Sequence, residues 1–244
     1  MRLRQEAPEV GMNLFLDSNI WLALYDSPRR DLDELGKLVR LVETGSVTLL
    51  LPDQVLHEVR RNRDKKIAND IAELQAEVLV EEVPPIFFNL PEYKSFAQTR
   101  RNYERARERL IARLVDDFEH GRLPADSLTD RLFAAGRRIP VTDELLLRAR
   151  SRYDLGNPPG KEGSYGDAVN WECLLAEIPP GQDLHLVTRD RDFASRIDRS
   201  RLSPFLEEEW RERKAARIFF YPRLSAFCCD HLPAVRLAEE GEVP

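Results

Sequence analysis

The sequence contains few cysteines and no cysteine motif. Cys173, Cys228 and Cys229 show no CxxC spacing, and no paired histidine cluster accompanies them. The sequence therefore indicates neither a disulfide framework nor a zinc site. We expect the three side chains to act as small buried hydrophobic groups.

Long apolar runs and low-complexity tracts are also absent. The first residues, MRLRQEAPEV, are charged, and the apolar stretch that follows is interrupted by Asp17 and Asn19, which argues against a secretory signal or a membrane span. With 42% hydrophobic and 33% charged residues, the composition is that of a globular chain. We expect a soluble cytoplasmic protein in which residues 1–12 form a disordered extension, 13–230 the folded domain and 231–244 a tail.

The chain has no excess of positive charge. Lys and Arg number 37 against 43 Asp and Glu, which gives a net charge of -6. At face value this charge predicts weak non-specific binding to nucleic acid. The distribution of the charges therefore matters more than their sum.

Apolar periodicity predicts strands that alternate with helices. Short apolar runs indicate strands at 13–17, 47–52, 183–188 and 217–221. Helical spacing predicts the intervening segments, including a long helix from 52 towards 82. Residues 86–140 are rich in Arg and Glu and helical in pattern, and we interpret them as a helical insertion. The alternation predicts a three-layer α/β/α fold with a mainly parallel central sheet.

Four carboxylates lie where such a fold collects its functional groups. In an open parallel sheet, that place is the crevice at the carboxyl ends of the strands. Asp17 ends the strand 13–17, and Asp190 follows the strand 183–188 by two residues. Glu58 and Asp167 lie early in two predicted helices. We expect all four side chains to reach one site.

Carboxylates crowded in this way resist ionising unless a divalent cation supplies positive charge. Mg²⁺ or Mn²⁺ suits a site made only of oxygen ligands. Such an ion can orient a water, lower its pKa for attack on phosphorus and neutralise the phosphate oxygens. The predicted chemistry is phosphodiester hydrolysis.

Two of the acids also have a structural alternative at a helix start. Asp17 or Ser18 could cap the helix that begins near Asn19, a role for which both residue types are well suited. Ser164 and Asp167 have the S-x-x-D spacing of a capping box. The residues alone leave these alternatives open.

The other acids have structural alternatives as well. Glu58 could interact within its own helix with Arg61 or Asn62. Asp190 and Asp192 could be turn and cap residues that follow a strand. No single carboxylate decides between a structural and a functional role.

The order and context of these residues resemble those of the PIN-domain nucleases. Four segments carry the resemblance: FLDSNIWL, LPDQVLHEVRRN, YGDAVNWECLLA and LVTRDRDF. The resemblance implies that the acidic catalytic and metal-binding positions of the family are Asp17, Glu58, Asp167 and Asp190, with Asn19 and Asp192 as auxiliary residues. It covers residues 13 to about 230, and the insertion 86–140 has no counterpart in the smallest family members. The pattern resembles larger bacterial PIN-like proteins more than it resembles the compact toxins of the family.

The resemblance implies a PIN-like fold and a ribonuclease that cleaves single-stranded RNA with Mg²⁺ or Mn²⁺. RNA is favoured over DNA as the partner. Because some members belong to toxin and antitoxin pairs, an antitoxin or another protein regulator is a further candidate partner, and a homodimer stays open. One alternative is a catalytically inactive PIN-like module that binds RNA or protein. Another is a DNA structure-specific nuclease.

Basic residues lie close to two of the acids. Arg60, Arg61 and Lys65 follow Glu58 on the same predicted helix, and Lys161 precedes Asp167 in a glycine-containing loop. We predict that these four cations bind phosphate groups of the substrate. A solvated charged helix and a rigid turn are the alternatives. In the insertion, arginines alternate with Glu104 and Glu108, as is typical of an exposed, salt-bridged helix, with a nucleic-acid surface as the second interpretation.

Overall fold

A five-stranded sheet forms the centre of the computed structural model, which describes residues 11–76, 83–160 and 165–237. All neighbouring strands in it run parallel. Their order is β3-β2-β1-β4-β5, and they are β1 (Met12–Leu16), β2 (Val47–Pro52), β3 (Arg137–Ile139), β4 (Leu184–Val187) and β5 (Ile218–Tyr221). The predicted parallel sheet is therefore confirmed.

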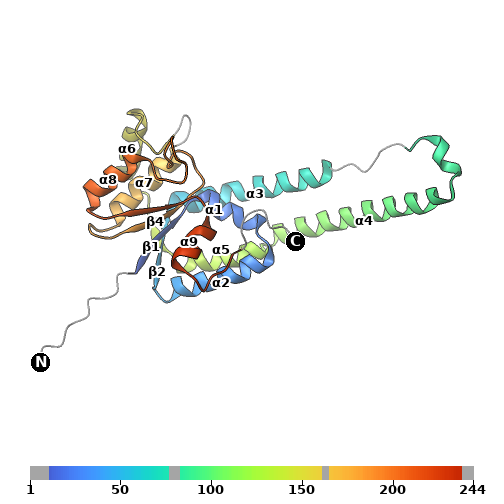
Figure 1. Ribbon diagram of the computed structural model, residues 1–244, viewed down its shortest axis with the longest axis horizontal. Helices are drawn as coiled ribbons and strands as arrows, with labels where there is room; N and C mark the ends of the chain where they lie inside the picture. Colours follow the sequence, from blue (N-terminus) through green and yellow to red (C-terminus); the bar gives the residue numbers. More distant parts are fainter. Residues whose placement is uncertain (1–10, 77–82, 161–164, 238–244) are drawn as a thin grey trace, which may run out of the picture.

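Helices cover both faces of the sheet (Figure 1). One face carries α2 (Arg29–Glu43), α5 (Pro124–Ala135) and α9 (Leu224–His231). The other carries α6 (Asp143–Asp154), α7 (Gly166–Glu177) and α8 (Pro204–Lys214). The short helix α1 (Ser18–Ala23) and a 3₁₀ turn, η1 (Leu24–Asp26), lead from β1 to α2. This arrangement confirms the predicted three-layer α/β/α fold.

The core explains why the strands are short, continuous apolar runs. Leu14, Phe15 and Leu16 of β1 are all buried, because a parallel sheet covered on both faces has no solvent side. Large aromatic side chains fill the layer above it. Trp171 of α7 and Trp210 of α8 are fully buried, with ring centroids 5.7 Å apart. The sheet is thus held rigidly between its two helical layers.

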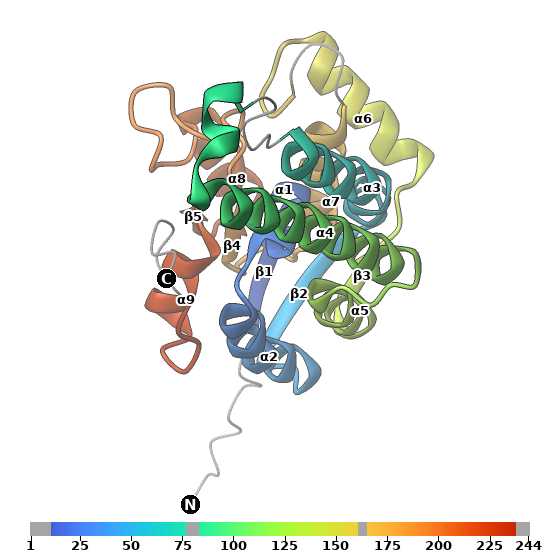
Figure 2. The same cartoon turned by 90° about the vertical axis from the view of Figure 1, so that its right-hand side faces the viewer.

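Two long helices form an arm that projects from this body (Figures 1 and 2). They are α3 (Asp53–Ala76), with 24 residues, and α4 (Pro91–Glu119), with 29 residues. At about 1.5 Å per residue, α4 alone is roughly 44 Å long. No residue of α4, which the structure describes in full, is buried. Helix α4 therefore adds no buried residue to the core, whereas the first part of α3 packs in the body and buries Val55, Leu56 and Val59.

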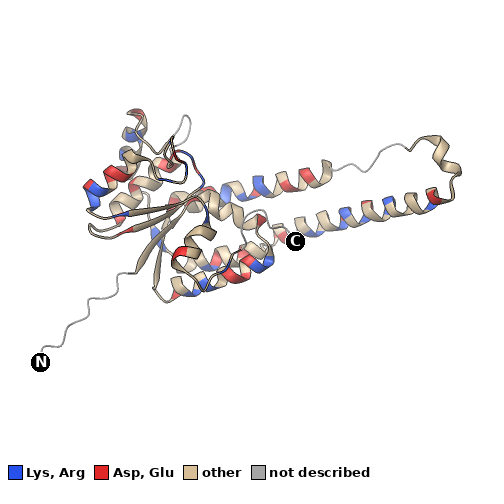
Figure 3. Ribbon diagram, in the orientation of Figure 1, with Lys and Arg blue, Asp and Glu red and all other residues tan. Residues whose placement is uncertain are grey.

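Basic residues lie along α4 and the first part of α3 (Figure 3). Two arginines of α4 form ion pairs with acids one turn later: Arg100 with Glu104 at 3.6 Å and Arg113 with Asp117 at 2.7 Å. These contacts agree with the expected exposed, salt-bridged helix. Pairs of this kind add little stability, since solvent screens them.

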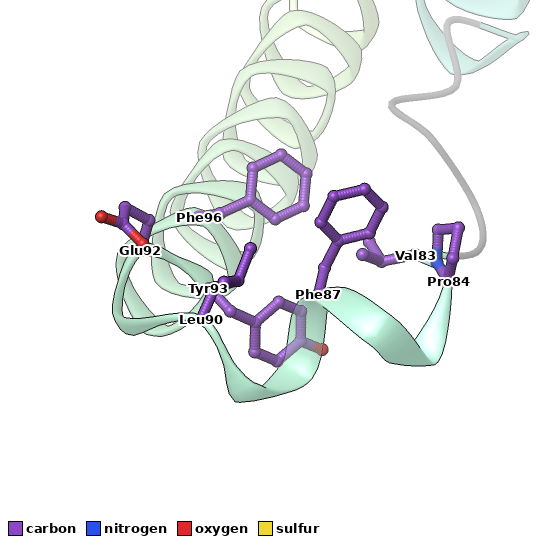
Figure 4. A pocket seen from close by; sticks show the side chains of 7 residues that line it. All are labelled: Val83, Pro84, Phe87, Leu90, Glu92, Tyr93 and Phe96. Carbon is purple, nitrogen blue, oxygen red and sulfur yellow. The ribbon is translucent and has the colours of Figure 1, made fainter.

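The far end of the arm is apolar. The 3₁₀ turn η2 (Pro85–Asn89) and the start of α4 surround a hollow of about 320 Å³ (Figure 4). The hollow is lined by Val83, Pro84, Phe87, Leu90, Glu92, Tyr93 and Phe96. Ile86 and Phe88 next to it are also exposed.

One arginine fixes the base of the arm to the body. Arg63 of α3 donates to both carboxylate oxygens of Asp126 on α5, at 2.7 and 2.9 Å. Its guanidinium also lies 4.3 Å from the ring centroid of Phe118, near the end of α4. Asp126 further accepts a hydrogen bond from the Tyr25 hydroxyl at 2.8 Å. These contacts hold α3, α4 and α5 together.

For the predicted insertion, about 86–140, the structure places only the first part outside the body. Helix α5 packs against α2 and buries Leu128 and Leu132, and β3 pairs with β2. The sequence pattern missed β3 because two of its three residues are exposed arginines and only Ile139 is buried. The limits of the domain and the insertion stay predictions. The segment 1–10 and the tail from 238 lie outside the described residues.

Candidate functional site

The strand order places a topological switch point between β1 and β4, the position at which open parallel sheets form a crevice. From β1 the chain moves to β2 and β3 on one side, and β4 and β5 lie on the other. Loops that leave β1 and β4 therefore diverge, and such a topological switch point is where open parallel sheets bind ligands. Asp17 directly follows β1, and Asp190 follows β4 by three residues. Two of the four predicted acids thus lie at the switch point.

Asp17 is buried at the end of β1, where each of its carboxylate oxygens has its own role. Oδ1 accepts a hydrogen bond from the Ser18 amide at 2.6 Å and so caps α1. Oδ2 accepts hydrogen bonds from the Thr188 hydroxyl at 2.6 Å and from the side-chain amide of Asn19 at 2.5 Å. The capping alternative is therefore correct for one oxygen, while the other belongs to the crevice.

The surroundings of Asp17 disfavour its charged form. Burial raises the pKa of Asp17 from 3.8 to about 6, although hydrogen bonds from Thr188 and Ser18 lower it in part. The negative charges of Glu58 and Asp190 raise it further. Acids from two other parts of the chain therefore lie close enough to affect the Asp17 carboxylate. A carboxylate in this position would be ionised fully by a nearby cation.

Asn19 and Thr188 connect the ends of the two strands. The Asn19 side chain donates to the Thr188 hydroxyl at 3.2 Å and accepts from the Arg189 amide at 3.1 Å. The Thr188 hydroxyl also accepts from the Asp190 amide at 2.9 Å. Thr188 was not among the predicted site residues, although it stands between the fourth strand and Asp190. Its hydroxyl orients both Asp17 and the turn that carries Asp190.

Three carboxylates gather next to this network. One oxygen each of Asp167, Asp190 and Asp192 lies within 4.8 Å of the other two. Asp190 also accepts from the Asp192 amide at 2.9 Å, as a turn residue would. Oδ2 of Asp192 is buried and has no hydrogen-bond partner among the described residues. An all-oxygen donor set with one unpartnered buried oxygen fits a divalent cation such as Mg²⁺ or Mn²⁺.

Glu58 approaches this group from α3. Its carboxylate accepts a hydrogen bond from Gln54 at 2.8 Å, and it forms no ion pair in the described part of the chain. Gly166, the first residue of α7, lies against it, since a Cβ on Gly166 would come within 2.1 Å of Glu58 Oε1. Glycine at this position therefore lets α3 and α7 approach closely. Glu58 consequently lies beside the residue that precedes Asp167.

The predicted phosphate-binding residues differ in what the structure describes. Arg60, Arg61 and Lys65 are exposed on α3 within two turns of Glu58. Lys161 lies outside the described residues, as does Ser164 of the capping-box alternative. Arg63 and Lys66 of the same basic run are engaged elsewhere: Arg63 binds Asp126, and Lys66 contacts Asp26 at 2.6 Å. In this basic run, two side chains therefore form ion pairs with other elements, and three are exposed to solvent near Glu58.

A buried ion-pair network supports α7 from behind. Arg152 of α6 contacts Glu172 of α7 at 2.7 Å and Glu209 of α8 at 2.5 Å. It also donates to the Pro158 carbonyl at 2.6 Å. This network was not predicted from the sequence, because the three charged residues are far apart in the chain. It holds α7, and with it Asp167, against the loop that precedes the helix.

Comparison with known proteins decides the family. A family model described as PIN domain matches residues 14–193, which is more than half of the chain. The chain belongs to the PIN domain family. The predicted resemblance is thereby confirmed. Membership of this family supports the interpretation of the protein as a nuclease that acts on nucleic acid. The matched span of this PIN domain protein includes Asp17, Glu58, Asp167, Asp190 and Asp192.

No curated protein and no solved structure matches the chain. Over the described ranges, no helix combines the length and apolar character needed to cross a membrane.

Proposed function

We propose that this PIN domain protein is a divalent-metal-dependent nuclease that hydrolyses phosphodiester bonds in single-stranded RNA. The observation that carries the proposal is the carboxylate group at the switch point, in which oxygens of Asp167, Asp190 and Asp192 lie within 4.8 Å of one another. We assign buried Asp17 to the same site, because the charges of Glu58 and Asp190 both raise its pKa. Carboxylates this close ionise together only beside a cation, and hard divalent ions prefer oxygen ligands.

We assign the roles as follows. Asp17 and Asp190 are the central ligands of Mg²⁺ or Mn²⁺, and Asp192 supports them. Glu58 and Asp167 either ligate the ion or orient the attacking water. A bound divalent ion supplies positive charge to the phosphate oxygens and lowers the pKa of a water for attack on phosphorus. Asn19 holds Asp17 in the required orientation by its hydrogen bond.

Basic side chains beside the site would bind the RNA backbone. Arg60, Arg61 and Lys65 are exposed close to Glu58 on α3, and we also propose Lys161, although it lies outside the described residues. Contacts of this type position a nucleic acid without reading its sequence. Each such phosphate contact releases counterions, so RNA binding should weaken as the salt concentration rises, and the net charge of -6 counts against tight binding. A toxin-like role, an antitoxin or other protein regulator, a homodimer and a cytoplasmic location remain predictions.

The deciding experiment is cleavage by purified full-length protein. Single-stranded RNA, single-stranded DNA and flap DNA are compared with Mn²⁺, with Mg²⁺ and with a chelator. We expect RNA to be cut with either metal, and Asp17→Asn to lower the rate at least ~100-fold, because a central ligand is lost. Asp33→Asn is the matched control, since the Asp33 side chain is 71% exposed on α2. Equal rates for Asp17→Asn and the wild type would contradict the proposal.

The same experiment distinguishes the two alternatives. Cleavage of flap DNA but not of RNA would favour a DNA structure-specific nuclease. A catalytically inactive PIN-like module would bind RNA but show no Mn²⁺ uptake in a calorimetric titration. The Asp192 oxygen without a hydrogen-bond partner in the described part of the chain argues against that module, because a carboxylate oxygen is costly to bury without one.

A further inference from the structure

Two contacts identify the side of α7 that faces the candidate site. At the start of the helix, Gly166 lies against the Glu58 carboxylate of α3. The next residue, Asp167, faces the turn after β4, because its carboxylate groups with those of Asp190 and Asp192. The face of α7 that carries Gly166 and Asp167 therefore points towards the acidic group, by which we mean Glu58, Asp167, Asp190 and Asp192.

Asn170 continues this side of the helix. It follows Gly166 by four residues and Asp167 by three, and residues at these spacings are neighbours on one helix face. Asn170 thus lies one turn, about 5 Å, further along α7 than the two residues that touch the acidic group. Its exposed fraction is 0%. The amide is therefore fully buried on the face of α7 that also carries Gly166 and Asp167.

The Asn170 amide has an unusual environment. Neither Nδ2 nor Oδ1 has a hydrogen-bond partner within the described ranges, and no other side chain there has two such buried atoms. Its neighbours on α7, among them Val169, Trp171 and Leu174, are apolar and buried. A leucine would fill a similar space without burying polar atoms that have no hydrogen-bond partner. Buried polar groups in folded proteins are almost always satisfied, and the usual unseen partners are a water or an ion.

We propose that Asn170 is a positioning residue of the acidic site, whose amide holds a water from the hydration shell of the divalent ion. The inference rests on the proposed function. An amide suits this task because it offers both a donor and an acceptor, as a water does. Mg²⁺ in proteins keeps several of its waters and takes only a few direct carboxylate ligands. Groups that hold such outer ligands tune metal affinity strongly.

The test uses Asn170→Leu in the full-length protein. Leucine has a similar shape and no polar atom, so it removes the unpartnered amide without opening a cavity. In chelator, we expect the thermal midpoint of Asn170→Leu to equal or exceed that of the wild type. We expect its Kd for Mn²⁺, measured by calorimetric titration, to rise at least ~10-fold. Higher stability together with weaker metal binding is a combination that a merely structural role would not produce.

Thr129→Val is the matched control. The Thr129 hydroxyl on α5 is likewise buried without a hydrogen-bond partner in the described part of the chain, but α5 lies on the opposite face of the sheet from α7. Its replacement should leave the Kd for Mn²⁺ unchanged. Wild-type Mn²⁺ affinity in Asn170→Leu, or a lower midpoint of that variant in chelator, would overturn the inference alone. A wild-type protein that binds no Mn²⁺ would overturn the proposed function as well.

Discussion

At the scale of single residues, the site depends on side chains that serve structure and chemistry together. Asp17 caps α1 with one oxygen and meets Thr188 and Asn19 with the other. Asp190 is both a turn residue and a member of the carboxylate group. This double use explains why each acid has a convincing structural alternative. A cap or a turn places a carboxylate at a strand end, and the neighbouring strand end then supplies the second one.

The raised pKa of Asp17 predicts how the stability of the metal-free protein changes with pH. The pKa rises from 3.8 to about 6 on folding. Between these values the folded protein binds more protons than the unfolded chain, so stability falls as pH increases. A shift of this size corresponds to about 3 kcal/mol, lost between roughly pH 4 and pH 6. Asp17→Asn should remove this contribution to the fall in the free energy of unfolding between pH 4 and pH 6.

The measurement is urea unfolding in chelator at pH 4, 5, 6 and 7. The free energy of unfolding of the wild type should fall more steeply over this range than that of Asp17→Asn. Asp33→Asn, which changes an exposed carboxylate, should keep the wild-type slope. Parallel curves for the wild type and Asp17→Asn would show that Asp17 titrates normally.

Sequence order suggested the acids that we propose for the site, but not the residues that support them. Asp17 and Asp190 lie at strand ends, and an apolar run followed by an acid is visible in the sequence. Arg152 and Asn170 could not be selected in this way. Their roles depend on partners or on an environment that only the packed helices create: Arg152 contacts Glu209, 57 positions away, and Asn170 becomes buried only when α7 packs.

At the scale of elements, strands were predictable where their residues form a continuous apolar run. The runs at 47–52 and 217–221 correspond to β2, which is mostly buried, and to the edge strand β5, whose residues are large and apolar although only Tyr221 is buried. β3 escaped prediction since two of its three residues are exposed arginines. Helices were predictable in kind. Their packing partners were not, and the approach of α3 to α7 depends on a single glycine.

That glycine supports a prediction about the two helices. In Gly166→Ala the new Cβ would come within 2.1 Å of Glu58 Oε1, and the flexible Glu58 side chain would have to move. We expect a stability change below about 1 kcal/mol, because no backbone must shift. The rate of RNA cleavage should fall at least ~10-fold, since small displacements of catalytic groups are costly.

Gly36→Ala is the control for this prediction. Gly36 lies within α2, and a Cβ there would meet nothing within 4 Å. Alanine should therefore raise stability by about 0.5–1 kcal/mol, with an unchanged cleavage rate. The two variants are compared by urea unfolding and by the RNA assay. If Gly166→Ala cleaves RNA at the wild-type rate, the position of Glu58 against α7 is unimportant.

At the scale of the whole molecule, the protein consists of a compact nuclease body and a long, thin arm (Figure 1). Helical periodicity predicted both kinds of helix alike, because an arm helix and a core helix can share an amphipathic pattern. What the pattern could not predict is where the apolar side of each helix goes. α5 buries Leu128 and Leu132 in the body, whereas α4 buries no residue along its described length.

Two leucines from the predicted insertion, one in the body and one in the arm, test this division. Leu132 of α5 is 1% exposed and belongs to the core, while Leu110 of α4 is 59% exposed. Leu132→Ala should lower the free energy of unfolding by about 2–5 kcal/mol, since it leaves a cavity. Leu110→Ala should change it by less than about 0.5 kcal/mol. Both values come from urea unfolding. A loss of stability confined to Leu132→Ala would assign α5 to the body and α4 to the arm. Similar losses of stability in both variants would mean that α4 packs in solution as a core helix does.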